Sequence, residues 1–316
     1  MNTEHNPIAV LVSKIQHKWN AEVHPSNEYK LVRWIIRPEQ ARLYEGFLKL
    51  ESSPHGSVPE TFVVMLTAFN TKKNFSRELI GHWLEQYKEE KEKLKNENST
   101  LDFLSWDFSE IEKQLQVKNA DTDQLLMEML HSFQQSLSDK KKPVVLAMMP
   151  KTVSSVNEFT DWLNDRLKQG IPEFVRFSVF DYEEERYFDD LFKRFKSSTK
   201  SLALPIDLQG AINKLSKMGD PNSPEVQFRT CMQEMGEATS ANNLTQLDKW
   251  GAKALEIAQR SGKKGFFASA HLIYAGMLFT FKKYEQINYL LEGGLRLAQL
   301  GLSEGDETCK VNIIQI

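Results

Sequence analysis

Residues 143–180 read PVVLAMMPKTVSSVNEFTDWLNDRLKQGIPEFVRFSVF, and this stretch decides the fold. Its two ends, PVVLAMM (143–149) and FVRFSVF (174–180), are apolar runs with the length of buried strands. The segment between them has helical periodicity. Ser155 is suited to cap that helix, with Glu158 in capping-box position, and Gly170 is suited to end it. Two strands joined by a helix need a crossover connection, so these residues predict parallel strands.

The same alternation extends over the first 200 residues. Apolar runs predict strands at 31–36 (LVRWII) and 61–69 (TFVVMLTAF), the second covered on both faces. Amphipathic patterns predict helices at 5–20, 38–50, 75–97, 121–137 and 183–196. After the opening helix the order is β-α-β-α-α-β-α-β-α. Residues 1–200 are therefore expected to form an α/β domain with a mostly parallel sheet and helices on its faces.

The composition is that of an ordinary globular protein. The chain has 316 residues, of which 41% are hydrophobic and 26% charged, and its formal net charge is −3. This length favours two domains, and this charge lacks the basic footprint of a nucleic-acid binder. No apolar run approaches the ~20 residues that span a bilayer, and no signal peptide is evident at the N-terminus. We therefore expect a cytoplasmic protein that does not insert into a membrane and does not bind nucleic acid.

The strand–helix alternation stops at residues 197–224, around a short predicted helix at 207–217. We place a linker at 201–222 and an all-helical domain at 223–316. This helical part can be laid over itself with a shift of 37 residues. The resulting pairs include Ala238 with Ala275, Leu247 with Tyr284, and Trp250 with Ile287.

The second copy, GFFASAHLIYAGMLFTFKKYEQINYLLEGGLRLAQLG (265–301), resembles a tetratricopeptide repeat. The resemblance implies that the two helices touch at Ala275 and Gly276, and that Leu291 and Gly294 pack back across the turn FKKYEQ. The copy departs from the family because His271 stands at the place of its signature Trp and the shift exceeds the typical period of ~34 residues. A generic antiparallel helical bundle is the alternative.

Two copies are fewer than the three or more repeats that usually bury a continuous core. Either the α/β domain caps this short stack, or the stack is incomplete and the array continues beyond residue 316. Stacked helix pairs expose a groove that suits a peptide or a partner helix. Between the packing positions of the second copy, His271, Tyr274 and Phe281 are aromatic candidates for contact with that partner.

No loop has the composition of a phosphate-binding loop. Strand 31–36 is followed by RPEQ, strand 61–69 by NTKKNFSRE, and the pair Gly262 and Gly265 follows a helix. The histidines and the two cysteines, Cys231 and Cys309, have neither zinc-site spacing nor a disulfide framework. No cofactor, metal or catalytic residue is therefore expected.

An acidic cluster follows strand 174–180 and begins at Asp181. A carboxylate at this edge of a parallel sheet could hold Mg²⁺. Alternatively, Asp181 caps the next helix, and the other acidic residues favour its positive N-terminal dipole end. We favour the helix interpretation. The cluster consists of Asp181, Glu183, Glu184, Glu185, Asp189 and Asp190.

The missing motifs and the helical repeat together lead to the hypothesis of a non-catalytic interaction protein, an adaptor or chaperone. The stretch LVRWIIRPEQARLYEGFLKLESSPHG (31–56), followed by TFVVMLTAFN (61–70), is similar to uncharacterised bacterial proteins that accompany type VI-like secretion machinery. That similarity implies an effector-loading or adaptor role in the cytoplasm. The alternative is a degenerate nucleotide-switch regulator, in which an ATPase-like domain precedes a helical sensor. An enzyme with a site around Asp181 is a third hypothesis.

Overall fold

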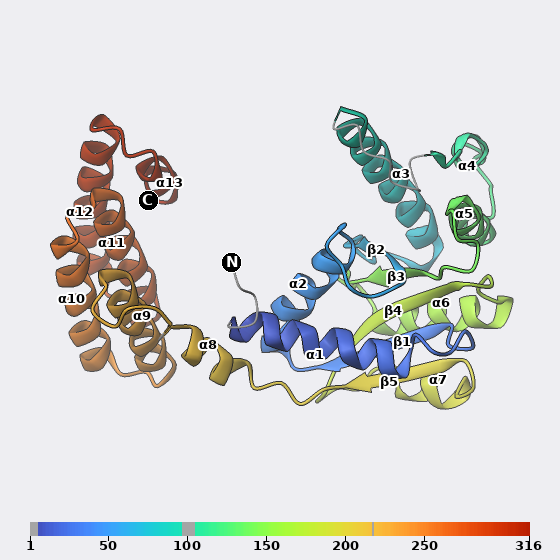
Figure 1. The fold of residues 1–316 in the computed structure, drawn as a ribbon, viewed down its shortest axis with the longest axis horizontal. Coiled ribbons are helices and arrows are strands. Elements are labelled where there is room, and N and C mark those ends of the chain that lie inside the picture. The colour runs from blue at the N-terminus through green and yellow to red at the C-terminus, as the bar shows by residue number, and fades with distance from the viewer. Residues whose placement is uncertain (1–5, 97–104, 217) are drawn as a thin grey trace. The chain divides into compact units, whose positions relative to one another are not determined.

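The computed structural model describes residues 6–96, 105–216 and 218–316. Within this part of the chain, two compact units form, Ala9–Ile206 and Asp207–Ile316 (Figure 1). We call them the α/β unit and the helical unit. The described strands all belong to the first unit.

Five parallel strands form one sheet in the order β2-β3-β4-β1-β5. The strands are β1 (Leu31–Ile36), β2 (Thr61–Met65), β3 (Val144–Met148), β4 (Val175–Tyr182) and β5 (Thr199–Ala203). Val144 of β3 lies opposite Val175 of the central strand β4, and Arg33 of β1 lies opposite Val179 of β4. The predicted parallel α/β architecture of the N-terminal part is confirmed.

The two edge strands differ from the prediction. β5 falls in residues 197–224, where the sequence indicated that the alternation ends, and it pairs with β1. Of its five residues only Thr199 and Leu202 are buried, so it lacks an apolar run that would predict a strand. β2 ends at Met65 rather than at Phe69, and three of its five residues are only partly buried because one side of the strand is a sheet edge. Both of its faces are nevertheless covered, as expected: Phe62 packs against Trp19 and Phe47, and Met65 belongs to the cluster on the other face.

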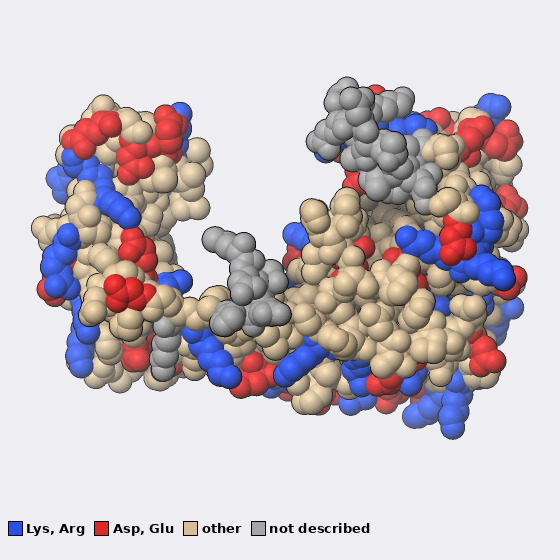
Figure 2. Space-filling view, viewed as in Figure 1, with Lys and Arg blue, Asp and Glu red and all other residues tan. Residues whose placement is uncertain are grey.

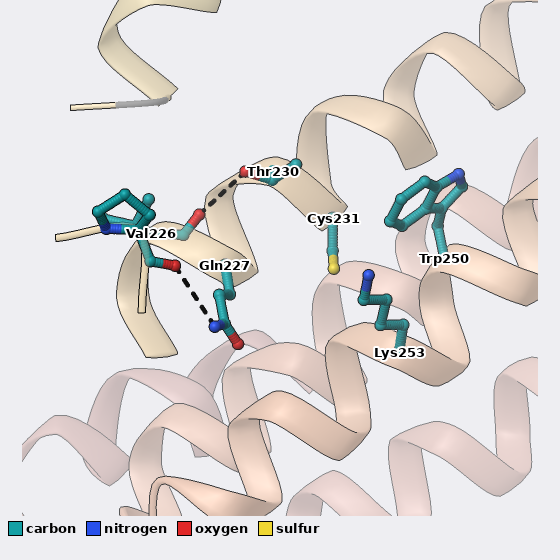
Figure 3. A pocket seen from close by; sticks show the side chains of 7 residues that line it. Val226, Gln227, Thr230, Cys231, Trp250 and Lys253 are labelled. Carbon is teal, nitrogen blue, oxygen red and sulfur yellow. Dashed lines mark hydrogen bonds between the residues drawn. The ribbon is translucent and has the colours of Figure 1, made fainter. Parts of the chain in front are cut away.

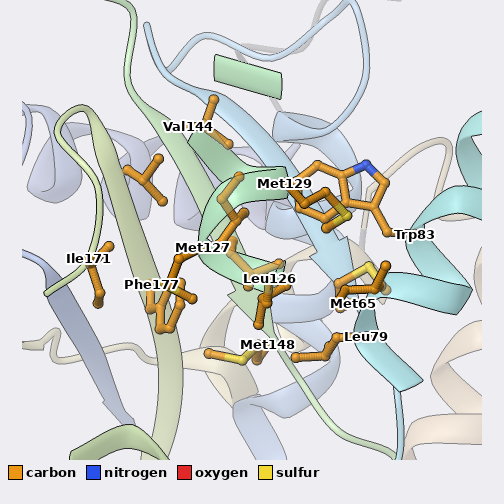
Figure 4. Close-up of a cluster of buried hydrophobic side chains, with 14 of the residues drawn as sticks. Met65, Leu79, Trp83, Leu126, Met127, Met129, Val144, Met148, Ile171 and Phe177 are labelled. Atoms are coloured by element: carbon orange, nitrogen blue, oxygen red, sulfur yellow. The ribbon is translucent and has the colours of Figure 1, made fainter. Parts of the chain in front are cut away.

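Helices cover both faces of the sheet (Figure 1). They are α1 (Pro7–Glu22), α2 (Ala41–Glu51, after a 3-10 turn η2 at Pro38–Gln40), α3 (Lys72–Asn96), α4 (Ser109–Leu115), α5 (Thr122–Ser136), α6 (Val156–Gln169) and α7 (Asp189–Arg194). On one face, Trp19 of α1 and Tyr44 of α2 pack against Trp34 of β1. On the other face, side chains of α3 and α5, such as Trp83 and Leu126, form a cluster with strand residues (Figure 4). The result is a sheet between two helical layers.

The helix α6 shows how local sequence sets these elements. The Ser155 hydroxyl accepts a hydrogen bond from the Glu158 amide (3.2 Å), and Gly170 ends the helix with a φ of 96°. Both predicted end signals are confirmed. The reciprocal half of the capping box does not form, because the Glu158 carboxylate accepts from the Lys72 amide of α3 instead (3.2 Å).

The helical unit consists of helices that run in antiparallel pairs (Figure 1). They are α8 (Leu208–Ser216), α9 (Pro224–Ser240), α10 (Leu244–Arg260), α11 (Lys264–Leu278, continued by a 3-10 turn η4 at Phe279–Phe281), α12 (Tyr284–Ser303) and α13 (Thr308–Gln315). α9 packs with α10 and α11 with α12, while α13 contacts both α11 and α12. Their shared core contains Cys231, Leu247, Tyr274 and Ile287.

The internal repeat has a shift of 40 residues rather than 37. α11 begins 40 residues after α9, and α12 begins 40 residues after α10. With this shift buried Leu247 falls on buried Ile287, and buried Ala254 on buried Gly294. The predicted shift instead placed Leu247 on Tyr284, which is 58% exposed. Three residues are close to one helical turn, so both shifts align the apolar stripes and the pattern alone does not separate them.

Candidate functional site

A hollow of about 540 Å³ opens between α9, the turn before it, and α10 (Figure 3). All of its lining residues belong to the helical unit. They are Pro221, Val226, Gln227, Thr230, Cys231, Trp250 and Lys253. Its volume lies in the range of ~300–1,000 Å³ that is typical of ligand sites.

Capping residues fix the two helices that border the hollow. The Ser223 hydroxyl accepts from the Val226 amide (3.2 Å), and Pro224 occupies the first turn of α9, where its missing N–H is no loss. Asn243 caps α10 in the same way by accepting from the Gln246 amide (3.1 Å). The hollow is therefore built on two well-started helices.

Trp250 forms one wall, and two lysines flank its ring. The Lys253 ammonium lies 4.9 Å from the ring centroid and the Lys249 ammonium 5.6 Å. Such cation–π contacts are worth ~0.5–1 kcal/mol at exposed sites. Trp250 itself is partly exposed, and both lysines are exposed. Neither lysine forms an ion pair with a residue that the structure describes. The rim of the hollow is therefore cationic and aromatic.

The floor is apolar and uncharged. Cys231 is fully buried, and burial raises the pKa of its thiol, while the Lys253 charge has a smaller effect in the opposite direction. Figure 3 shows the Lys253 ammonium pointing toward the Cys231 sulfur. Because the thiol stays protonated at neutral pH, it acts as a small hydrophobic surface beside Val226 rather than as a nucleophile.

The hollow therefore suits binding rather than chemistry. No histidine or carboxylate lines it, and its buried thiol stays protonated. It offers an apolar floor, an aromatic wall and an ammonium group at the rim. An apolar side chain of a binding partner fits the floor and wall, and a neighbouring anion would meet the lysines.

Two of the three predicted partner-contact residues lie in the core instead. Tyr274 is only 4% exposed. Its hydroxyl donates to the Asp248 carboxylate of α10 and accepts from the Gln286 amide of α12 (2.8 Å). Its ring lies against Gly251, where an added Cβ would be 2.5 Å from the ring. Tyr274 therefore packs where three helices meet, and a partner could not reach a side chain that is buried in this way.

His271 is also in the core, with 9% of its surface exposed, and its Nδ1 hydrogen-bonds the Phe267 carbonyl (2.9 Å). Burial lowers the pKa of its imidazole, which favours the neutral form. Phe281 is partly buried against the same core. Gly276, expected where the two helices touch, is exposed and faces open space.

Trp250 was not predicted as a site residue, because the shift of 37 residues placed it on a packing position. The available signal for this site was the run Lys249–Lys253, in which one lysine directly precedes Trp250 and the other follows it by three residues.

Asp181 is neither a metal ligand nor a helix cap. It lies inside β4, 1% exposed, and its carboxylate accepts from Arg33 of β1 (2.8 Å) and from the amides of Tyr187 and Phe188. The Arg33 guanidinium also reaches Asp189 (2.5 Å). Because α7 begins only at Asp189, both predicted roles of Asp181 were wrong, and the carboxylate instead neutralises a buried arginine.

The connections that leave the neighbouring strands β1 and β4 run in opposite directions along the sheet. The chain goes from β1 to β2 at one edge, and from β4 past β1 to β5 at the other edge. Ligands of parallel α/β sheets bind at such a point, outside the carboxyl ends of the strands. Here the loop after β1 is occupied by internal bonds. The Arg37 amide donates to the Gln40 side chain (3.0 Å), and the Arg37 guanidinium donates to the Ile206 carbonyl (3.0 Å).

A second, smaller hollow of about 260 Å³ lies between α6 and the segment that leads into α7. Both charge signs line it, including Asp161, Asp190 and Arg194, and the Arg194 guanidinium already donates to the Asn164 side chain (2.7 Å). These internal pairs leave it without a consistent ligand preference. The hollow between α9 and α10 is therefore the better candidate.

Other classes of site find little support in the described residues. No group of three or more His, Cys, Asp or Glu side chains is placed there to hold a metal ion. Among the same residues, no helix has the length and apolar composition needed to cross a membrane. Compared with known proteins, the chain matches no family model and no solved structure.

Proposed function

We propose that this protein is a non-catalytic adaptor or chaperone whose helical unit binds a partner protein at the hollow between α9 and α10. The observation that carries this proposal is the partly exposed Trp250, which forms a wall of that hollow. When a partner covers an indole ring that is partly exposed beside an apolar floor, the burial of its apolar surface favours binding.

Tryptophan is enriched among the residues that dominate binding energy at protein interfaces. Truncation of such an anchor typically costs about 2 kcal/mol or more in binding. Val226 and Cys231 line the floor but are already buried, so the Trp250 ring supplies the apolar surface that a partner would cover, and Gln227 and Thr230 provide polar groups at the rim. This is the usual anatomy of an interface centre with a polar surround.

The likeness of residues 31–70 to bacterial proteins that accompany type VI-like secretion machinery makes the proposal more specific. In that setting the partner would be an effector or a machinery component, and the tetratricopeptide-like helical unit would hold it before delivery. The α/β unit would then serve as a docking module of its own.

The test compares two aromatic substitutions in the full chain. Trp250→Ala removes the wall of the hollow, whereas Tyr289→Ala removes a side chain of α12 that is 72% exposed and does not line it. Tagged proteins are expressed in the native host, and the captured proteins are quantified against wild type. We expect W250A to lose partners that Y289A retains, at similar melting temperatures. Retention of every wild-type partner by W250A would contradict the proposal.

The degenerate nucleotide-switch regulator is a second candidate, favoured by the change of connection direction between β1 and β4. Against it, the loop Arg37–Gln40 contains no glycine and its Arg37 amide is already bonded. Such a loop offers no cradle of free amides to a phosphate. Calorimetric titration with Mg–ATP should show no micromolar binding, and micromolar affinity would favour the regulator over the adaptor.

A further inference from the structure

We propose that the hollow between α9 and α10 recognises a partner segment in which carboxylates neighbour a large apolar side chain. This inference rests on the proposed function and adds the chemistry of the partner. Three features carry it: the ammonium groups of Lys253, which lines the hollow, and of the adjoining Lys249, neither with an acidic partner among the described residues; the Trp250 ring close to both; and an uncharged floor.

Three other lysines of the helical unit have carboxylate partners. Lys263 pairs with Glu225 (2.8 Å), and Lys264 and Lys310 also have carboxylate partners. Lys249 and Lys253 have no such partner among the described residues, and both ammonium groups are held beside Trp250. Two cations on the same indole ring create a local positive potential that attracts an acidic segment and repels a basic one.

Glu234, whose charge acts on the floor, does not cancel this potential. The charge of Glu234 reaches the Cys231 thiol and contributes to its raised pKa, but it is a weaker influence than that of Lys253. Glu234 also does not line the hollow. The ammonium of Lys253 is therefore the charged group that an entering side chain meets.

The distances fix the pattern that the partner must carry. Because the Lys253 ammonium lies only 4.9 Å from the Trp250 ring centroid, the carboxylate and the apolar side chain must be neighbours in the partner segment. The apolar side chain would cover the exposed part of the Trp250 ring, above the buried Val226 and Cys231. The carboxylate would remain at the rim, where an ion pair avoids the cost of full burial.

A single-stranded nucleic acid is the competing occupant, because bases stack on aromatic rings and phosphates meet lysines. The charge of the unit favours the acidic protein segment. Residues 207–316 contain 12 Lys and Arg and 12 Asp and Glu. Figure 2 shows both signs interspersed on the visible face of this unit. A neutral surface with a cationic spot lacks the extended basic track that nucleic acid requires.

The test uses fluorescence anisotropy with the full chain and labelled peptides of equal length. The probes are an acidic–apolar peptide (ELDFELDFELDF), its basic counterpart (KLKFKLKFKLKF) and an acidic peptide without apolar residues (ESDSESDSESDS). A labelled oligouridylate serves as the nucleic-acid probe. We expect the acidic–apolar probe to bind most tightly, and its affinity to fall as salt concentration rises.

Charge reversal then locates the site. The double variant K249E/K253E should weaken binding of the acidic–apolar probe roughly tenfold or more, because it replaces attraction by repulsion at two rim positions. The control K282E/K283E reverses two exposed lysines at the turn before α12, outside the hollow, and should change affinity less than twofold. Circular dichroism confirms that each variant is folded.

Four outcomes would overturn the inference: equal binding of the basic probe, tighter binding of the oligouridylate, no effect of K249E/K253E, or no binding of the acidic–apolar probe at ~1 mM. The partner-capture experiment separates this failure from that of the proposed function. If W250A loses its partner while K249E/K253E keeps it, the hollow binds a partner of other chemistry. If W250A also keeps it, the proposed function itself is contradicted.

Discussion

A buried ion pair, Arg33–Asp181, ties β1 to the central strand β4. Arg33 is 5% exposed and Asp181 1%, and the guanidinium also lies 4.4 Å from the ring centroid of Phe192. Removal of Asp181 would leave the buried guanidinium with only the partly exposed Asp189 carboxylate as its charged partner, which is more costly than loss of a surface pair.

We therefore predict that Asp181→Ala lowers the free energy of unfolding by about 3–5 kcal/mol. The control is Asp190→Ala, whose carboxylate is 90% exposed and pairs with Lys193 at 3.3 Å. That change should stay within ~0.5 kcal/mol of wild type. Urea denaturation followed by tryptophan fluorescence measures both. Equal effects of the two variants would show that Asp181 does not carry a buried charge.

The second residue-scale prediction concerns Tyr274. Because its ring and hydroxyl join α10, α11 and α12, Tyr274→Ala should lower the free energy of unfolding by about 3–5 kcal/mol. Phe279→Ala removes an aromatic side chain that is 55% exposed and should change it by less than ~0.5 kcal/mol. If thermal unfolding shows Y274A to be as stable as wild type while partner capture fails, Tyr274 is a binding residue after all.

Sequence reasoning succeeded for residues whose role is local and failed for those with distant partners. Ser155 and Gly170 act on their own helix, so their neighbours in sequence were sufficient to predict them. Asp181 depends on Arg33, which is 148 residues away. Helical periodicity assigned Tyr274 to a face of α11, but it carries no information about what that face meets.

At the scale of elements, the paired helices α9–α10 and α11–α12 share one packing scheme with different close contacts. Gly251 of α10 touches the Tyr274 ring, whereas Gly276 of α11 has no atom within 4 Å of the place where a Cβ would be. The tetratricopeptide resemblance implied contacts at Gly276 and Gly294. Gly294 of α12 lies against His271 of α11, where an added Cβ would be 3.1 Å from the His271 Cβ, whereas Gly276 has no such neighbour. Gly251 adds a close contact between α10 and α11, on the helix that borders the hollow.

These two glycines give a matched prediction. Gly251→Ala should destabilise the protein by about 1–3 kcal/mol, because the added carbon would lie 2.5 Å from the Tyr274 ring. Gly276→Ala should stabilise it by ~0.5–1 kcal/mol through higher helix propensity. Thermal unfolding of both variants checks the signs. Destabilisation by G276A would restore the helix contact that the resemblance implied.

Elements with a continuous apolar run were predictable, and edge elements were not. β3 and β4 lie inside the sheet, and their runs identified them directly. β5 has two buried residues of five, since an edge strand on this sheet needs little apolar surface. The apolar pattern predicted the two helix pairs, but the predicted shift was three residues too short. Apolar positions recur at about every helical turn, so shifts that differ by one turn align them equally well.

For the whole molecule, the boundary between the units lies at residues 206 and 207, within the linker predicted at 201–222. β5 extends the sheet to Ala203, and the Ile206 carbonyl accepts from Arg37, so residues up to 206 belong to the α/β unit. Residues 219–222 are exposed and follow α8. The predicted linker at 201–222 therefore includes the last three residues of β5 and the whole of α8.

We predict that a protease of broad specificity cuts first within residues 218–223, because exposed turns without strand or helix bonding are the preferred sites. Two fragments should accumulate, with new N-termini identified by mass spectrometry. Early cleavage within 143–181, with residues 218–223 intact, would contradict a sheet centred on β3, β4 and β1.

The central claim is that a partner enters the hollow between α9 and α10, and photo-crosslinking tests it most directly. A benzophenone amino acid is introduced in the full chain at Gln227, which lines the hollow, and separately at exposed Tyr289. After irradiation in the native host, we predict a discrete crosslinked partner from the Gln227 position that Trp250→Ala and the acidic–apolar peptide abolish. Crosslinks that form equally well from both positions, or that persist in W250A, would contradict the account.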